Sequence, residues 1–231
     1  MTAMFWASLF FMSLVGALAN IVPDYLSFLE TRNVLARMGR GVISDILLIL
    51  LDFVLSGLIA LLAAPEAEPH FIVSLAGMHM AMEATLLDQA EAMMRAAGAS
   101  DAQVAANQRL QDAAFAVLRE AEPGQDVSQA MQTALIEAGA PEAVAAQQAR
   151  AFGQPYAVAS FQLDPAEAAS AYDGPMLAVF GEYDLQVLPG PQTQALTAAR
   201  PNAPTEIVIL DGVNHLFQET ETGVASEYGS P

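Results

Sequence analysis

Three short apolar runs constrain the fold of this 231-residue chain most strongly. They are FIVSLAG at 71–77, PMLAVFGEYD at 175–184 and TEIVILDG at 205–212. Runs of this length that are rich in apolar and β-branched residues and lie next to glycine are typical of buried β-strands. Segments with helical spacing of apolar residues separate them, including 191–199 before the last run. Strands that alternate with helices form parallel sheets, so the sequence predicts an α/β fold.

The longest helical segment lies between the first two predicted strands. Across residues 79–151 apolar side chains recur at helical spacing, as in LLDQAEAMMRAA and QRLQDAAFAVLREA. This pattern predicts three or four helices. Segments containing Gly or Pro are expected to separate these helices, and they are 98–101, 123–126 and 139–141. Ser100 or Asp101, and Asp126, are suitable N-caps for the helices that follow.

Two polar residues follow neighbouring predicted strands. Asp184 follows the second run, and His215 follows the third. Functional groups of α/β sheets collect at the carboxyl ends of the strands. An Asp and a His there can form the pair in which the carboxylate orients the imidazole and the imidazole accepts a proton from a nucleophile. From spacing alone, a purely structural role for both residues remains the alternative.

The residues around these two positions resemble motifs of bacterial α/β-hydrolases. FGEYDLQV at 180–187 resembles the family's acid motif, and GVNHLFQ at 212–218 resembles its histidine motif. The nearest resemblance is to the esterase-like, serine-aminopeptidase-like branch. FIVSLAG resembles the strand that follows the nucleophile helix, and residues 161–175 resemble the approach to the acid strand. The resemblance covers about residues 57–231 and continues through Thr222-Gly223 and Glu227-Tyr228.

This resemblance implies an incomplete α/β-hydrolase domain at 65–231, with a helical cap at about 79–170. It implies that Asp184 is the acid and His215 the base of a catalytic triad. It also implies a serine carboxylic-ester hydrolase whose substrate is a small ester or acyl compound.

The nucleophile of that family is missing from the sequence. The family carries Gly-x-Ser-x-Gly on a strand-to-helix turn, and this pattern occurs nowhere in the chain. If Gly57 to Ala60 is the family's helix start, the turn falls on DFVLSG at 52–57, and Val54 occupies the nucleophile position. Ser56 lies two residues too late. The strands that precede the turn are expected to be missing too, so we predict that this chain alone does not hydrolyse esters.

Residues 1–64 are apolar and predict a transmembrane hairpin, with spans at about 3–22 and 43–64. Residues 1–23 contain no charged side chain, and about 20 apolar residues suffice to cross a bilayer. For the first span a signal peptide is the alternative, because Ala17-Leu18-Ala19 resembles a cleavage site. In the second span Asp52 is an unfavourable residue near the middle.

The segment between the spans suggests an orientation. Residues 24–40 contain three arginines, which favours a cytoplasmic loop and an extracytoplasmic acidic domain. This part of the chain also resembles a fragment of multi-pass bacterial membrane proteins. The residues that carry the resemblance are Asn20, Asp24 to Ser27 and Glu30 to Arg32.

The formal net charge of −18 limits the partners of the chain. Residues 63–231 hold five arginines and 22 acidic residues, so this part should repel nucleic acid and anionic membrane surfaces. The chain has no cysteine, which excludes disulfides and thiolate metal sites. Its three histidines are not spaced as metal ligands, and no glycine-rich phosphate loop is present. We expect no cofactor and no metal.

Two other interpretations are compatible with the sequence. One is a membrane-anchored interaction protein that binds a partner or a second copy through an open sheet edge. The other is a chimeric or truncated gene product without a function of its own, because the Leu-rich second span and the family's helix start overlap near residue 57.

Overall fold

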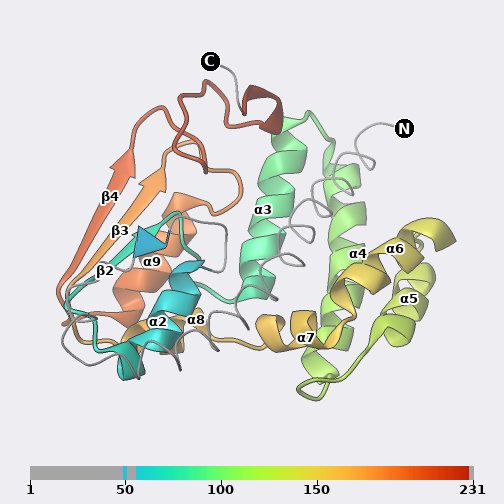
Figure 1. Cartoon of the computed structure of the whole chain (residues 1–231). Helices are drawn as coiled ribbons and strands as arrows, with labels where there is room; N and C mark the ends of the chain where they lie inside the picture. Colours follow the sequence, from blue (N-terminus) through green and yellow to red (C-terminus); the bar gives the residue numbers. More distant parts are fainter. Residues whose placement is uncertain (1–48, 51–55, 229–231) are drawn as a thin grey trace. The chain divides into compact units, whose positions relative to one another are not determined.

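The computed structural model describes residues 49–50 and 56–228 (Figure 1). Their contacts divide them into two compact units. The sheet unit contains residues 49–50, 56–89 and 164–228, and the helical unit contains Ala90–Leu163. The helical unit lies within the cap predicted at 79–170, and α3 (Met82–Ala96) contributes to both units.

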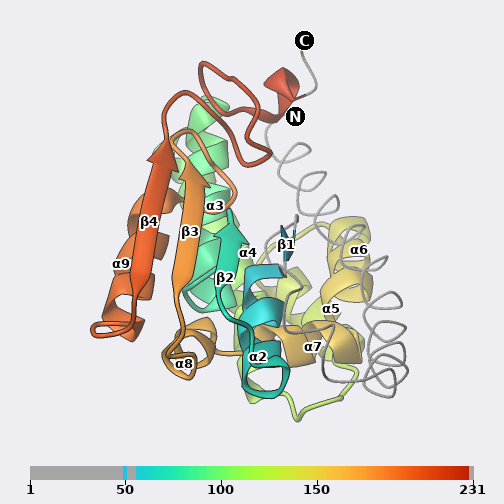
Figure 2. The same cartoon turned by 60° about the vertical axis from the view of Figure 1, so that its left-hand side comes forward.

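The sheet unit contains four parallel strands in the order β1-β2-β3-β4 (Figure 2). They are β1 (Ile49–Leu50), β2 (Ile72–Leu75), β3 (Met176–Gly181) and β4 (Thr205–Leu210). Val73 is the register partner of Leu177, and Leu177 is that of Glu206. The mixed α/β fold and the three predicted strand runs are therefore confirmed.

Three helices pack beside this sheet (Figure 1). They are α2 (Ser56–Ala67), α8 (Pro165–Ser170) and α9 (Pro189–Ala199). Helix α8 contacts both α2 and α9, while α2 contacts β2 and α9 contacts β4. Leu58 and Leu61 of α2 are buried, as are Ile72 of β2 and Phe180 of β3. Burial of these large side chains, at about 1.5–3 kcal/mol each, holds the strand ends in place.

The helical unit contains α4 (Asp101–Glu120), α5 (Ser128–Glu137), α6 (Glu142–Phe152), α7 (Pro155–Phe161) and the end of α3. The helices fall between the predicted breaks. Ser100 is the N-cap of α4, and its main-chain N–H donates to Oε1 of Gln103 at 2.9 Å. The N-cap expected at Asp126 is one residue early, since Val127 holds that position. The Asp126 carboxylate still accepts from the N–H of Ser128 at 2.9 Å.

The structure corrects the second predicted membrane span at 43–64. Ile49–Leu50 form a strand beside Val73 and Ser74, and a separate helix begins at Ser56. The prediction of one continuous membrane-spanning helix is therefore wrong. The expectation that no strand precedes the predicted nucleophile turn is also wrong, because β1 does so. The boundary predicted after residue 64 falls inside α2. The span prediction failed because an apolar, Leu-rich segment is as compatible with a protein core as with lipid.

None of the helices in the described part of the chain combines the length and the apolar character that a membrane crossing requires. The first predicted span, 3–22, and the loop at 24–40 lie outside the described residues.

Arg200 ties the segment before β3 to the start of β4. It is only 4% exposed. Its guanidinium donates to the carbonyl oxygens of Ala169, Tyr172 and Gly174 and to Oγ1 of Thr205. The guanidinium also lies 5.3 Å from the centroid of the Tyr172 ring. Burial lowers the pKa of Arg200.

We expect Arg200→Lys to lower the free energy of unfolding by about 2–3 kcal/mol, because an ammonium cannot reach all four acceptors of the planar guanidinium. Urea denaturation measures the change. Arg150→Lys at an exposed position of α6 is the matched control and should change stability by less than about 0.5 kcal/mol. Equal effects of the two substitutions would contradict the role of Arg200.

Candidate functional site

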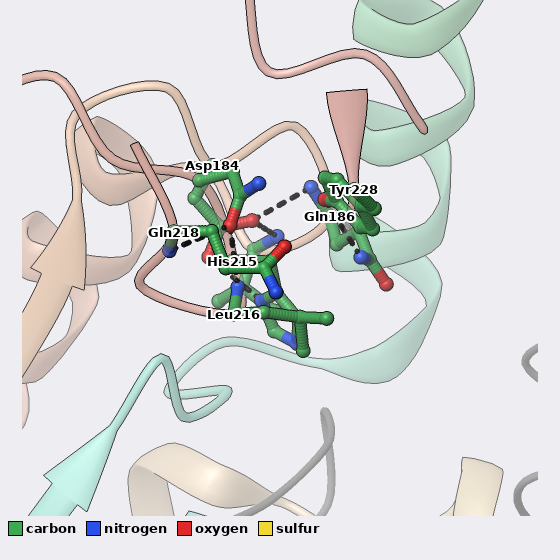
Figure 3. Close-up of polar contacts among 8 residues, drawn as sticks. Asp184, Gln186, His215, Leu216, Gln218 and Tyr228 are labelled. Atoms are coloured by element: carbon green, nitrogen blue, oxygen red, sulfur yellow. Dashed lines mark hydrogen bonds and ion pairs between the residues drawn. The ribbon is translucent and has the colours of Figure 1, made fainter. Parts of the chain in front are cut away.

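Asp184 and His215 meet at the carboxyl end of the sheet (Figure 3). Asp184 lies three residues after the end of β3, and His215 lies five residues after the end of the neighbouring β4. Nδ1 of His215 is 2.8 Å from Oδ2 of Asp184. Both side chains are buried, with exposed fractions of 2% for His215 and 0% for Asp184. The structure therefore brings together the two residues that the sequence predicted as acid and base.

The turn after β3 fixes the carboxylate of Asp184. Its Oδ1 accepts from the main-chain N–H groups of Gln186 and Val187, each at 2.8 Å, which leaves Oδ2 for His215. The N–H of Asp184 donates to the carbonyl of Gly181 at 3.2 Å and closes the turn. Both carboxylate oxygens thus have a donor, and this is how buried charged groups are stabilised.

The loop that carries His215 is held against the same turn. The N–H of Tyr183 donates to the carbonyl of Val213 at 3.0 Å. Oδ1 of Asn214 accepts from the N–H groups of Leu216 and Gln218, at 2.9 and 3.1 Å (Figure 3). A Cβ on Gly181 would lie 2.5 Å from the carbonyl oxygen of Asn214. Glycine is therefore needed at position 181 for this close approach.

This arrangement selects one tautomer of the imidazole. An ionised carboxylate only accepts hydrogen bonds, so Nδ1 of His215 carries the proton that faces Asp184. Nε2 then keeps its lone pair and can accept a proton from a hydroxyl group. Among residues 49–50 and 56–228 no hydrogen bond to Nε2 of His215 is present. The contact therefore has the geometry of an imidazole base with an orienting carboxylate.

The predicted nucleophile position falls between a strand and a helix. Residues 51–55 connect β1, which ends at Leu50, to α2, which begins at Ser56. This strand-to-helix order is the setting that a nucleophile turn requires. Val54 itself lies outside the described residues. Ser56 is the first residue of α2.

Sequence reasoning missed a second histidine-containing pair in the sheet unit, formed by Ser74 and His79. Oγ of Ser74 on β2 lies 3.3 Å from Nε2 of His79, and both residues are buried. Oε1 of Gln192 accepts from the N–H groups of His79 and Met80 at 2.6 and 3.1 Å, and its Nε2 donates to Oγ1 of Thr85 at 3.0 Å. The one sequence signal for this network was Ser74, a polar residue within the apolar run at 71–77.

This second pair is unsuited to catalysis. Nδ1 of His79 is buried and has no hydrogen-bond partner among the described residues, so none of their carboxylates orients the ring. Burial, with a smaller contribution from the charge of Arg200, lowers the pKa of His79 to about 4. An imidazole with that pKa is a weak base near neutral pH. The network therefore links β2 to α9 as a structural element.

Within residues 49–50 and 56–228, no group of three or more His, Asp or Glu side chains is arranged to hold a metal ion.

Comparison with known proteins gives similarity to solved structures only. No family model matches the chain, and no curated protein matches it. A hydrolase from Pseudomonas aeruginosa PA01 is 20% identical with a TM-score of 0.32, and 70% of this chain covers 54% of that one. A thermophilic esterase from Thermogutta terrifontis is 16% identical with a TM-score of 0.32, and 71% of this chain covers 56% of that one.

A third similar structure is Est816, an N-acyl homoserine lactone degrading enzyme. It is 16% identical with a TM-score of 0.34, and 71% of this chain covers 59% of it. The similar structures are α/β-hydrolases, and this chain spans little more than half of their length. Nothing in the comparisons supports the resemblance of the segment around residues 20–32 to multi-pass membrane proteins.

We expect Asp184→Asn to abolish the preference for the Nδ1–H tautomer of His215, because an amide can present an N–H to Nδ1. Nitrogen-15 chemical shifts of the labelled imidazole report which ring nitrogen is protonated at a pH where the ring is neutral. The control is Asp211→Asn, at an exposed position just after β4. An unchanged tautomer in Asp184→Asn would contradict the orienting role.

We also expect His79 to make the fold sensitive to acid. The unfolded chain takes up a proton near pH 6.5, while the folded chain remains neutral at His79 down to about pH 4. Stability is therefore lost as the pH falls through this window, by about 3 kcal/mol in all. Urea denaturation at pH 7.5, 5.5 and 4 should show this loss in the wild type and a smaller loss in His79→Gln.

His70→Gln is the control for removing an imidazole from an exposed position. If the stability of wild type and His79→Gln fell in parallel between pH 7 and 4, His79 would not be the acid-sensitive group.

Proposed function

We propose that the sheet unit carries the acid–base half of a carboxylic-ester hydrolase site of the α/β-hydrolase type. The observation that carries the proposal is the buried 2.8 Å contact between Nδ1 of His215 and Oδ2 of Asp184, at the ends of adjacent parallel strands. The motifs around both residues resemble the acid and histidine motifs of that family, which supports the same assignment.

In this function His215 is the general base. Its Nε2 accepts the proton of a hydroxyl nucleophile as the oxygen attacks the ester carbonyl carbon. The same proton then passes to the leaving alcohol when the tetrahedral intermediate collapses. Asp184 holds the ring in its tautomer and stabilises the imidazolium that forms. Small ester or acyl compounds are the proposed substrates.

The chain by itself is proposed to lack turnover. Valine has no nucleophilic atom, and Val54 occupies the position where the family carries its serine. Loss of a triad serine costs on the order of 10⁶ in turnover. The order β1, residues 51–55, α2 supports this alignment of the nucleophile turn with residues 52–57.

The test is a fluorophosphonate probe, which labels activated serines, together with hydrolysis of a short-chain p-nitrophenyl ester. We expect no labelling of the wild type. Asp52→Gly, Val54→Ser and Ser56→Gly together restore Gly-x-Ser-x-Gly at 52–56, and this variant should gain labelling. Adding His215→Ala should lower the labelling rate at least about 10²-fold, because the base contributes about 10²–10⁴.

Stoichiometric labelling of the wild type would contradict the missing nucleophile. Labelling of the restored variant that does not depend on His215 would contradict the base. Ser56→Gly alone is the control for the restored variant, because it changes the turn without supplying a serine at position 54. This control should show no labelling.

A second candidate function is binding of a protein partner or of another copy of the chain. The observation that favours it is the exposure of Ile209 and Leu210, at 45% and 40%, on β4, which is the last strand of the described sheet. Partner binding that survives His215→Ala would favour this function, whereas ester binding that requires His215 would favour the hydrolase site.

Membrane anchoring is proposed for residues 3–22 alone. Without a second span the acidic units lie on the same side of the membrane as the arginines of residues 24–40, and those arginines favour the cytoplasmic side. The anchoring is supported by the absence of charged side chains in residues 1–23.

A further inference from the structure

The C-terminal segment returns to the acid–base pair after the His215 loop. Glu219 forms an antiparallel bridge with Val213, and the N–H of Thr220 donates to the carbonyl of Gly212 at 2.9 Å. The chain then turns and ends in the short helix η1 (Ala225–Glu227) followed by Tyr228. This segment belongs to the sheet unit.

One carboxylate closes the segment into a loop. Glu227 accepts from the hydroxyl groups of Thr220 and Thr222 and from the N–H groups of Glu221 and Thr222. These bonds, the Thr220 hydroxyl first, lower the pKa of Glu227 to about 2. The carboxylate therefore stays ionised and keeps the loop closed at any pH well above that value.

The closed loop rests directly on the turn that carries the acid. Gly223 has a φ of +74°, and a Cβ there would lie 2.1 Å from the carbonyl oxygen of Tyr183, the residue before Asp184. Only glycine allows this approach. The loop thus places Tyr228 at a fixed point beside the pair.

The hydroxyl of Tyr228 is bonded to the turn that carries Asp184 (Figure 3). Nε2 of Gln186 donates to it at 3.1 Å, and the main-chain N–H of Gln186 donates to Oδ1 of Asp184. The segment that carries Tyr228 is itself bonded to the His215 loop through the Val213–Glu219 bridge and the bond from Thr220 to Gly212. Burial is the largest cause of the raised pKa of Tyr228, so the phenol stays neutral and accepts the bond from Gln186 near neutral pH.

We propose that Tyr228 is a positioning residue: through Gln186 its hydroxyl joins the Asp184 turn to the C-terminal segment that is bonded to the His215 loop, and so it fixes the contact between Nδ1 and Oδ2. The inference rests on the proposed function for its catalytic meaning only. The geometry it describes exists whether or not the chain hydrolyses esters.

The experiment uses the full chain with nitrogen-15 histidine and compares wild type with Tyr228→Phe. We expect the Nδ1 proton of His215 to exchange with solvent about 5- to 10-fold faster in the variant, because one hydrogen bond between the loops is lost. The ring signals of His79, which lies in a separate network, serve as the internal reference and should not change. Tyr183→Phe is the matched control, since this ring is 37% exposed and adjacent to Asp184.

A second variant keeps the test decisive if Tyr228→Phe does not fold. Gln186→Met removes the donor on the Asp184 side and retains the Tyr228 ring, and it should accelerate the same exchange. Unchanged exchange in Tyr228→Phe, or in Gln186→Met if only that variant folds, overturns the proposal. Equal acceleration at His79, or in Tyr183→Phe, also overturns it, because the effect would then be a general loosening of the fold.

The rate of fluorophosphonate labelling distinguishes a failure of this proposal from a failure of the hydrolase function. Tyr228→Phe added to the variant with Gly-x-Ser-x-Gly at 52–56 should slow fluorophosphonate labelling about 5-fold or more. If the restored variant shows no labelling at all, the proposed function fails, while the exchange of the His215 proton still decides the role of Tyr228.

Discussion

The contact between Asp184 and His215 is the interaction on which the rest of the site depends. A buried carboxylate is tolerated only when its oxygens have donors, and here two main-chain N–H groups and one imidazole supply them. Parallel pairing of β3 with β4 brings the two chain segments to the same edge. Gly181 then lets the loop of His215 approach closely enough for the contact to form.

The apolar segment before and within α2 shows how one composition can suit two environments. Leucine-rich sequence without lysine or arginine predicts a membrane span, because lipid and protein core both exclude charge. The contacts of the segment decide between the two environments. Ile49–Leu50 pair in parallel with β2, and Leu58 and Leu61 are buried in the core, so this segment is part of the sheet unit.

Much of the fold could be predicted from local pattern. The strands at β2, β3 and β4, the helices between residues 79 and 151, and the cap at Ser100 all follow from short-range signals of period, glycine and capping. The strand β1 could not be predicted, because two residues inside a long apolar run carry no period. The network of Ser74, His79 and Gln192 was missed because Gln192 lies 113 positions from His79.

The sequence by itself determined the order of the strands β2, β3 and β4 and of the helices between them, and it singled out Asp184 and His215 as the candidate acid and base. These follow from residue type and from spacing along the chain. Only the tertiary structure decided that Asp184 and His215 touch, that Ser74 and His79 form an inert pair, and that Tyr228 bonds to the turn of Asp184 through Gln186. The physical reason is that hydrogen bonds between distant residues depend on strand register and loop closure, and neither leaves a local mark in the sequence.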